Sequence, residues 1–282
     1  MTNNMAYSSI TKPSLHFNTK LYTGNAGTNA ITGVGFQPDW NWIKCRSHAD
    51  SSQIFDVLRT TYALRSDGTN AEAVGNGWTS LDSDGFTLNG DSSGGNVNNS
   101  GRTYASWNWK ANGAGSANTD GTISSTVSAS ATSGFSIVKW TGSGANATVG
   151  HGLGVAPKMI ILKNTSEVYG WQVYHASLGN TKYVSLNSTD AQATSSQSWN
   201  NTSPTSTVFS VGASDSNNKS GNTIIAYCFA EKQGFSKFSS YVGNGSTDGT
   251  FTYLGFKPAF VMVKATGLVK NWCILDNKRD GY

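Results

Sequence analysis

Charged residues are scarce in this chain of 282 residues. Asp, Glu, Lys and Arg together make up 13% of the sequence, about half of their share in an average globular protein. The 20 Lys and Arg outnumber the 16 Asp and Glu, which gives a formal charge of +4, but the basic residues are scattered. Because nucleic-acid binding needs clustered positive charge, the composition does not favour a nucleic-acid partner.

Cysteines and long apolar runs are also few. The three cysteines, Cys45, Cys228 and Cys273, are an odd number, which excludes a complete disulfide framework. We expect each to be a small buried side chain within an apolar strand. No apolar run approaches the roughly 18 residues of a membrane helix, so we expect no membrane insertion. The opening residues, MTNNMAYSSITKPS, lack the apolar core of a signal peptide.

A repeated pattern organises the residues that are present. Gly-x-x-Pro is followed by an apolar strand and by a Lys six residues after the proline. The pattern begins at Pro38, Pro157 and Pro258 and ends at Lys44, Lys163 and Lys264. A second block, at residues 100–109, returns at residues 220–229. These periods are too long for a solenoid and indicate whole domains in tandem.

Many short runs of strand-forming residues, separated by Gly, Asn and Ser, predict an all-β chain of tandem antiparallel β-sandwich modules of the jelly-roll or lectin-like kind. The apolar run after each proline predicts a strand in the centre of its sheet. We expect each module to bury its own aromatic residues and the modules to stack as an extended rod. The predicted segments are a lead-in (1–20), a first module (21–110), a linker (111–133), a second module (134–231) and a partial third module (234–282).

The partial third module lacks the closing strand of the other two, so we expect the polypeptide to continue beyond Tyr282. The linker contains two short strand-like runs, Thr122-Ile123-Ser124 and Thr126-Val127-Ser128, which could add an edge strand.

Residue patterns with known chemistry are incomplete in this chain. Cys45-x-x-His48 lacks the second half of a zinc site. Asp82-x-Asp84-Gly85 lacks the further ligands of a calcium loop, and we expect these carboxylates to accept hydrogen bonds within a turn. The 16 acidic residues are spread over turns and do not form the opposed pair of a glycosidase. We therefore predict a protein that is not an enzyme and has no catalytic residues, cofactor or metal site.

Trp78 and Trp199 are the candidate ligand-binding residues. Each lies in a run of Ser, Thr, Asn and Gly, so its indole could stack on a sugar ring or could anchor a loop as a half-buried side chain. Both interpretations stay open. Other tryptophans lie in predicted strands and are matched by large apolar residues in the sister copies, which favours core packing: Trp107, Trp109, Trp171 and Trp272.

The chain from Ser9 onward resembles a repeated β domain of structural proteins of tailed phages, mainly phages of marine and cyanobacterial hosts. The resemblance is carried by the lead-in SITKPSLHFNTKLYTG, the strand between proline and lysine, the turn SDGFTL and the closing strand WNWK. It implies a virion appendage such as a tail fibre or another host-contact protein, assembled in the host cytoplasm and built as a homotrimer with other tail proteins as partners. It implies no catalytic residue.

Three functions are therefore weighed from the sequence. The first is a non-enzymatic tail fibre or host-contact adhesin. The second is a set of carbohydrate-binding modules that contact host-surface glycans. The third is a decoration or neck protein of the capsid, which differs from the first in its number of copies per particle.

Overall fold

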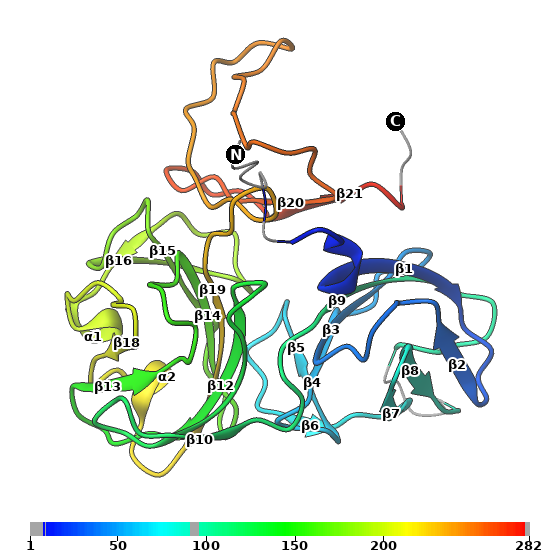
Figure 1. Ribbon diagram of the computed structural model, residues 1–282, viewed down its shortest axis with the longest axis horizontal. Helices are drawn as coiled ribbons and strands as arrows, with labels where there is room; N and C mark the ends of the chain where they lie inside the picture. Colours follow the sequence, from blue (N-terminus) through cyan, green and yellow to red (C-terminus); the bar gives the residue numbers. More distant parts are fainter. Residues whose placement is uncertain (1–7, 9, 91–95, 280–282) are drawn as a thin grey trace, which may run out of the picture.

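The computed structural model describes residue 8 and residues 10–90 and 96–279 (Figure 1). The described chain is built almost wholly from β-strands, and the strands of every sheet pair antiparallel. One isolated parallel bridge joins Ile123 to Val149. The all-β prediction is confirmed, because alternating strand-forming residues and glycine-rich turns outweigh any helical pattern.

Unit 1 (residues 17–110) follows the single-turn helix η1 (Pro13–Leu15) and contains two sheets. The larger sheet runs in the order β1 (Phe17–Thr23), β9 (Thr103–Trp109), β3 (Trp40–Cys45), β4 (Gln53–Asp56), β5 (Tyr62–Arg65) and β6 (Ala73–Val74). The smaller sheet runs in the order β2 (Asn29–Thr32), β8 (Gly85–Leu88) and β7 (Trp78–Asp82). Between the two sheets lie buried side chains that include Ile31, Ile43, Phe55, Trp78, Phe86 and Tyr104.

Gly85 makes the tight turn between β7 and β8 possible. Its φ of +147° is a conformation that side-chain-bearing residues rarely adopt. A Cβ at this position would lie 1.9 Å from the carbonyl oxygen of Ile31. The turn therefore requires glycine, as the SDG sequence indicates.

Unit 2 (residues 134–231) has the same plan. Its larger sheet runs in the order β10 (Ser116–Asn118), β11 (Ser125–Ser130), β12 (Phe135–Thr141), β19 (Thr223–Phe229), β14 (Met159–Asn164), β15 (Gln172–His175), β16 (Lys182–Ser185) and β17 (Ala193–Thr194). The second layer consists of β13 (Ala147–Gly150), β18 (Val208–Val211) and the one-turn helices α1 (Ser196–Trp199) and α2 (Asp215–Asn218). The side chains between these layers include Trp140, Val149, Ile160, Tyr174, Trp199 and Phe209.

The two larger sheets share one strand order. The order β1-β9-β3-β4-β5-β6 in unit 1 corresponds to β12-β19-β14-β15-β16-β17 in unit 2, and the pair β2-β8 corresponds to β13-β18. The strands after Pro38 and Pro157 have a neighbour on each side, which confirms their predicted central position. Residues 111–133 are more than a linker, because they supply β10 and β11 to the sheet of unit 2.

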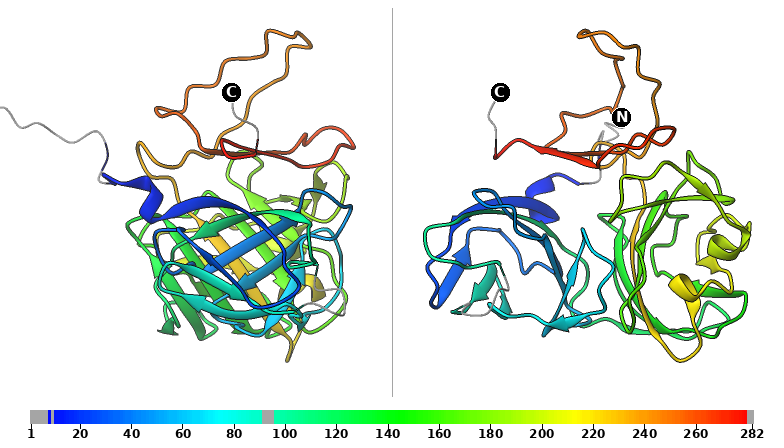
Figure 2. Two further views of the ribbon diagram at one scale, coloured as in Figure 1. Left: turned by 90° about the vertical axis from the view of Figure 1, so that its right-hand side faces the viewer. Right: turned by 180° about the vertical axis from the view of Figure 1, so that it is seen from behind.

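Unit 3 (residues 234–279) contributes a single hairpin to the described chain. Its strands are β20 (Phe260–Val263) and β21 (Cys273–Asp276), which pair antiparallel with Phe260 opposite Asp276. The hairpin lies across one end of the two larger sheets (Figures 1 and 2).

A shared hydrophobic core joins the three units. Its buried members come from both larger sheets, and the hairpin of unit 3 packs against them. Trp40 of unit 1 contacts Phe135 and Phe229 of unit 2, with ring centroids 5.6 and 5.8 Å apart. The expectation that each module buries only its own aromatics is therefore wrong. The expected extended rod is wrong for the same reason, since the units surround one core instead of following one another along a line (Figure 1).

Candidate functional site

Trp78 and Trp199, the candidate ligand-binding residues, are both buried. The indole of Trp78 stacks between Phe55 and Phe86, with centroid distances of 4.2 and 5.3 Å. The indole N–H of Trp199 donates a hydrogen bond of 3.1 Å to the carbonyl of Lys182. Neither ring presents a free face to solvent, so of the two interpretations that the sequence left open, the structure favours the anchoring side chain, which is buried more deeply than expected.

The cysteines differ from one another in burial. Cys45 and Cys228 are buried as expected, whereas Cys273 on β21 is exposed, which corrects the prediction for that residue. Within the described residues, no group of three or more His, Cys, Asp and Glu side chains is placed to hold a metal ion. Among the same residues, no helix is long and apolar enough to cross a membrane.

The carboxylates of the SDG turn act within the turn. Asp84 accepts hydrogen bonds from the backbone N–H groups of Gly35 and Gly33, at 2.5 and 3.0 Å, and these bonds lower the pKa of Asp84. Asp82 accepts from the hydroxyls of Ser80 and Thr87. Both carboxylates thus serve the turn, in agreement with their expected role.

A buried ionic cluster joins unit 1 to unit 2. Asp56 ends β4, and its side chain accepts from the backbone N–H of Leu58, which fixes the turn that brings Arg59 back toward it. The Arg59 guanidinium pairs with Asp56 at 2.6 Å and lies 3.5 Å from Glu72. The hydroxyl of Tyr227, on β19 of unit 2, donates to Asp56 at 2.7 Å and lies 3.1 Å from Arg59.

The neighbouring groups of this cluster stabilise the charged form of Arg59. Burial alone lowers the pKa of Arg59, but Asp56, Tyr227 and Glu72 outweigh that effect and raise it, so Arg59 stays positively charged. Burial raises the pKa of Tyr227 well above its usual value, which keeps its hydroxyl protonated as a donor. A buried, paired and hydrogen-bonded cluster of this kind fastens the two sheets to each other.

Unit 3 repeats this arrangement against unit 1. Counted from their prolines, Asp276 and Arg279 occupy the positions of Asp56 and Arg59. Asp276 pairs with Arg279 at 2.5 Å and accepts a hydrogen bond of 3.0 Å from the indole N–H of Trp107. The guanidinium of Arg279 lies over the Trp107 ring, 4.9 Å from its centroid. Trp107 of β9 is the counterpart of Tyr227 of β19, so the contact from unit 3 to unit 1 mirrors the contact from unit 1 to unit 2.

The aromatic contacts around these clusters correspond in the same way. Two residues after their prolines, Trp40 and Phe260 each touch three aromatic side chains of the next unit. The partners of Trp40 are Phe135, Tyr227 and Phe229, at centroid distances of 5.6, 4.6 and 5.8 Å. The partners of Phe260 are Phe17, Trp107 and Trp109, at 5.4, 6.1 and 5.5 Å.

A second set of contacts joins unit 1 to unit 2 and unit 2 to unit 3 through tryptophans. The indole N–H of Trp171 donates to the carbonyl of Arg65 at 2.9 Å. At the corresponding positions, the indole N–H of Trp272 donates to the carbonyl of Ser185 at 2.8 Å. Each tryptophan thus binds the end of β5 or β16 in the preceding unit. Unit 1 has Ser52 at this position.

The lysines at the end of the repeated strand complete this second set. Lys163 is fully buried and donates to the carbonyls of Thr69 and Asn164, at 3.3 and 2.6 Å. Lys264 donates to the carbonyl of Thr189, the counterpart of Thr69, at 3.0 Å. Burial lowers the pKa of Lys163 to about 8, an effect that nearby Arg59 increases.

Taken together, the contacts run from unit 1 to unit 2, from unit 2 to unit 3 and from unit 3 back to unit 1. Each uses one patch of a unit against a different patch of the next, which is a head-to-tail contact. Three such contacts close on themselves, so one chain surrounds its aromatic core with three units. We name these contacts the unit junctions. Sequence reasoning found the repeated lysine but missed its role, and it also missed the Asp-x-x-Arg spacing shared by units 1 and 3.

Residues 12–282 match the family described as a domain of unknown function, DUF7483. No curated protein and no solved structure matches the chain.

Proposed function

The chain belongs to the DUF7483 family, whose model matches residues 12–282. We propose that it is a non-enzymatic structural protein of a phage particle. The proposed location is a tail fibre or another host-contact appendage, assembled in the host cytoplasm. The resemblance of its repeated motifs to phage structural domains motivates this proposal.

The unit junctions are the observation that carries the structural role. The buried charged side chains of Asp56 and Arg59 hold one unit against the next. Every aromatic contact of Trp40 with unit 2 likewise fixes the relative position of two sheets. A protein whose buried polar chemistry serves mutual packing is suited to bear load as a rigid block.

The carbohydrate-binding alternative loses its sequence-based candidates, because the chain's own side chains cover Trp78 and Trp199. A glycan array tests this alternative. If an array hit were abolished by Trp78→Ala while the variant stayed folded by circular dichroism, the alternative would gain support over the structural role.

Immunoelectron microscopy of purified phage particles tests the main proposal. Antibodies against this chain should label the tail or its fibres, and antibodies against an unrelated host protein serve as the control. Absence of the chain from purified particles would refute a virion role. Label spread evenly over the capsid, with a copy number in proportion to the shell, would instead identify a decoration protein.

The proposed homotrimer and its tail-protein partners need a separate measurement. Analytical ultracentrifugation of the purified chain distinguishes a trimer, of roughly three times 29.8 kDa, from a monomer. A monomer at micromolar concentration would show that the three units of one chain suffice and that any oligomer forms only with other tail proteins.

A further inference from the structure

The strand β20 has one open edge. In unit 1, β3 lies between β9 and β4, and in unit 2, β14 lies between β19 and β15. In unit 3, β20 pairs with β21, the counterpart of β4 and β15, and within the described residues no strand occupies the place of β9 and β19. Its backbone N–H and C=O groups on that side are available to a further strand.

The outer face of the same hairpin is uncovered. Leu275 is 61% exposed, whereas Phe55 and Tyr174, at the corresponding positions of units 1 and 2, are 1% and 4% exposed. Phe251 is 87% exposed, and its counterpart Ile31 is 5% exposed. Large apolar side chains stand in water here because the described part of unit 3 has no second layer.

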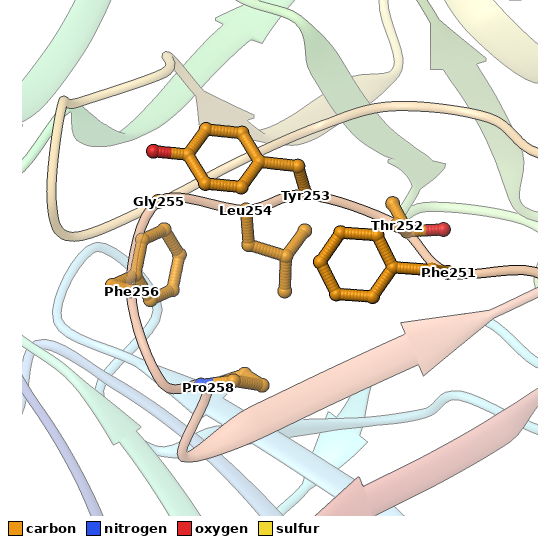
Figure 3. Close-up of a pocket in the computed structure, with 7 residues that line it drawn as sticks. All are labelled: Phe251, Thr252, Tyr253, Leu254, Gly255, Phe256 and Pro258. Atoms are coloured by element: carbon orange, nitrogen blue, oxygen red, sulfur yellow. The ribbon is translucent and has the colours of Figure 1, made fainter.

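An apolar hollow marks where that layer belongs. Figure 3 shows Phe251, Leu254, Phe256 and Pro258 around a hollow of about 420 Å³ beside the start of β20. In unit 1 the counterparts of Leu254 and Phe256, Val34 and Phe36, are buried. In the described part of unit 3, this hollow thus corresponds to the interior that side chains fill in units 1 and 2.

The other two units show what fills these positions. In unit 2, one continuous segment, residues 207–230, supplies both β18, which pairs with β13, and β19, which pairs with β14. Its Phe209 and Val211 enter the interior of unit 2, and its Phe229 pairs with Met159 on the strand after the proline. In unit 1, Trp109 of β9 pairs with Trp40 in the same way.

We propose that the open edge of β20, together with the outer face of the hairpin, is a docking site for a polypeptide segment of the β18–β19 type. This partner contains two strands joined by a turn. Its second strand pairs antiparallel with β20 and places an aromatic residue opposite Phe260, while its first strand covers Phe251 and Leu275. Strand addition to an exposed edge is an established mode of peptide recognition. The proposal rests on the fold and not on a virion role.

A synthetic peptide with the sequence of residues 207–230, carrying a fluorescent label, tests this site against the full chain. We expect saturable binding by fluorescence anisotropy and slower hydrogen exchange at the amides of Phe260–Val263 in the complex. A scrambled peptide of the same composition should show no saturable binding and should leave the hydrogen exchange of these amides unchanged. Absence of saturable binding, or unchanged exchange at these amides, would overturn the proposal.

Two matched variants locate the peptide. Leu275→Glu leaves a carboxylate in water in the free protein but buries it under the peptide, so we expect binding to weaken about tenfold or more. Leu268→Glu makes the same change at an equally exposed leucine, 62% against 61%. Unit 2 has Glu167 at the position of Leu268, so we expect a change of about twofold or less.

Equal effects of the two variants would overturn the placement of the peptide. Concentration-dependent dimerisation that Leu275→Glu abolishes, without peptide binding to the monomer, would assign the face to a second copy of the chain instead.

Discussion

Replacement of Asp56 by alanine removes the carboxylate at the centre of the junction between units 1 and 2. The change deletes the 2.6 Å ion pair with Arg59 and the acceptor of the 2.7 Å bond from Tyr227. Arg59 keeps only the longer 3.5 Å contact with Glu72 as an ionic partner. Loss of one partner from a buried pair leaves an uncompensated charge, so we expect the free energy of unfolding to fall by about 3–5 kcal/mol.

A double variant separates the free-energy cost of leaving Arg59 unpaired from the net contribution of the ion pair to stability. In Asp56→Ala with Arg59→Met, no guanidinium is left buried without a partner, so we expect stability to recover part of the loss of the single variant. The coupling between the two sites follows from the double-mutant cycle. Urea unfolding followed by tryptophan fluorescence measures each free energy.

The control uses an ion pair of similar length at the surface. Lys219 and Glu167 lie 2.7 Å apart, and both side chains are partly exposed. Glu167→Ala should cost about 0–1 kcal/mol, because water screens exposed pairs. If Asp56→Ala costs no more than this control, the cluster does not hold the units together. A double variant as unstable as the sum of its single changes would also contradict the reasoning.

Three further predictions concern other contacts. Trp272→Phe removes the hydrogen bond to the carbonyl of Ser185 and should cost about 0.5–1.5 kcal/mol in the same urea assay; an unchanged midpoint would contradict the role of this bond. Trp78→Ala and Trp199→Ala should each lower the free energy of unfolding by about 3–5 kcal/mol, because both rings are buried, and a loss below about 1 kcal/mol would contradict their interior placement. Folding lowers the pKa of Lys163 from 10.5 to about 8, so the unfolded chain binds more protons than the folded chain above pH 8. The free energy of unfolding should therefore rise between pH 8 and 9, by up to about 1 kcal/mol. Lys163→Met should abolish this rise, and a rise that persists in the variant would exclude Lys163 as its source.

Much of the architecture could be predicted from the repeated sequence. The run Met159-Ile160-Ile161-Leu162 is apolar at every position because both faces of β14 are covered, and this pattern placed the strand centrally. The pattern could not tell what covers each face. One face of this strand packs on the interior of unit 2, and the other packs on the core shared with units 1 and 3. A rod of self-contained modules and a closed set of three units therefore predict the same apolar strand.

The errors at single residues have similar causes. Trp78 lies among polar loop residues, but its ring is clamped by Phe55 and Phe86, which the folding of two sheets brings together from distant positions. Cys273 lies in an apolar strand pattern that predicts burial, but among the residues that the structure describes no second layer covers the outer face of its hairpin. The local sequence indicates how apolar a strand is, but it does not show which distant residues pack against it.

The closed set of units also shapes the order in which the protein can fold. Trp107 and Trp109 of β9 receive their cover from Phe260, about 150 residues later in the chain. During synthesis, the larger sheet of unit 1 therefore emerges with the aromatic side chains of β9 uncovered. They stay uncovered until the β20–β21 hairpin leaves the ribosome. Such an uncovered aromatic flank promotes aggregation with other nascent chains, so slow translation of residues 234–279 would favour aggregates over native protein.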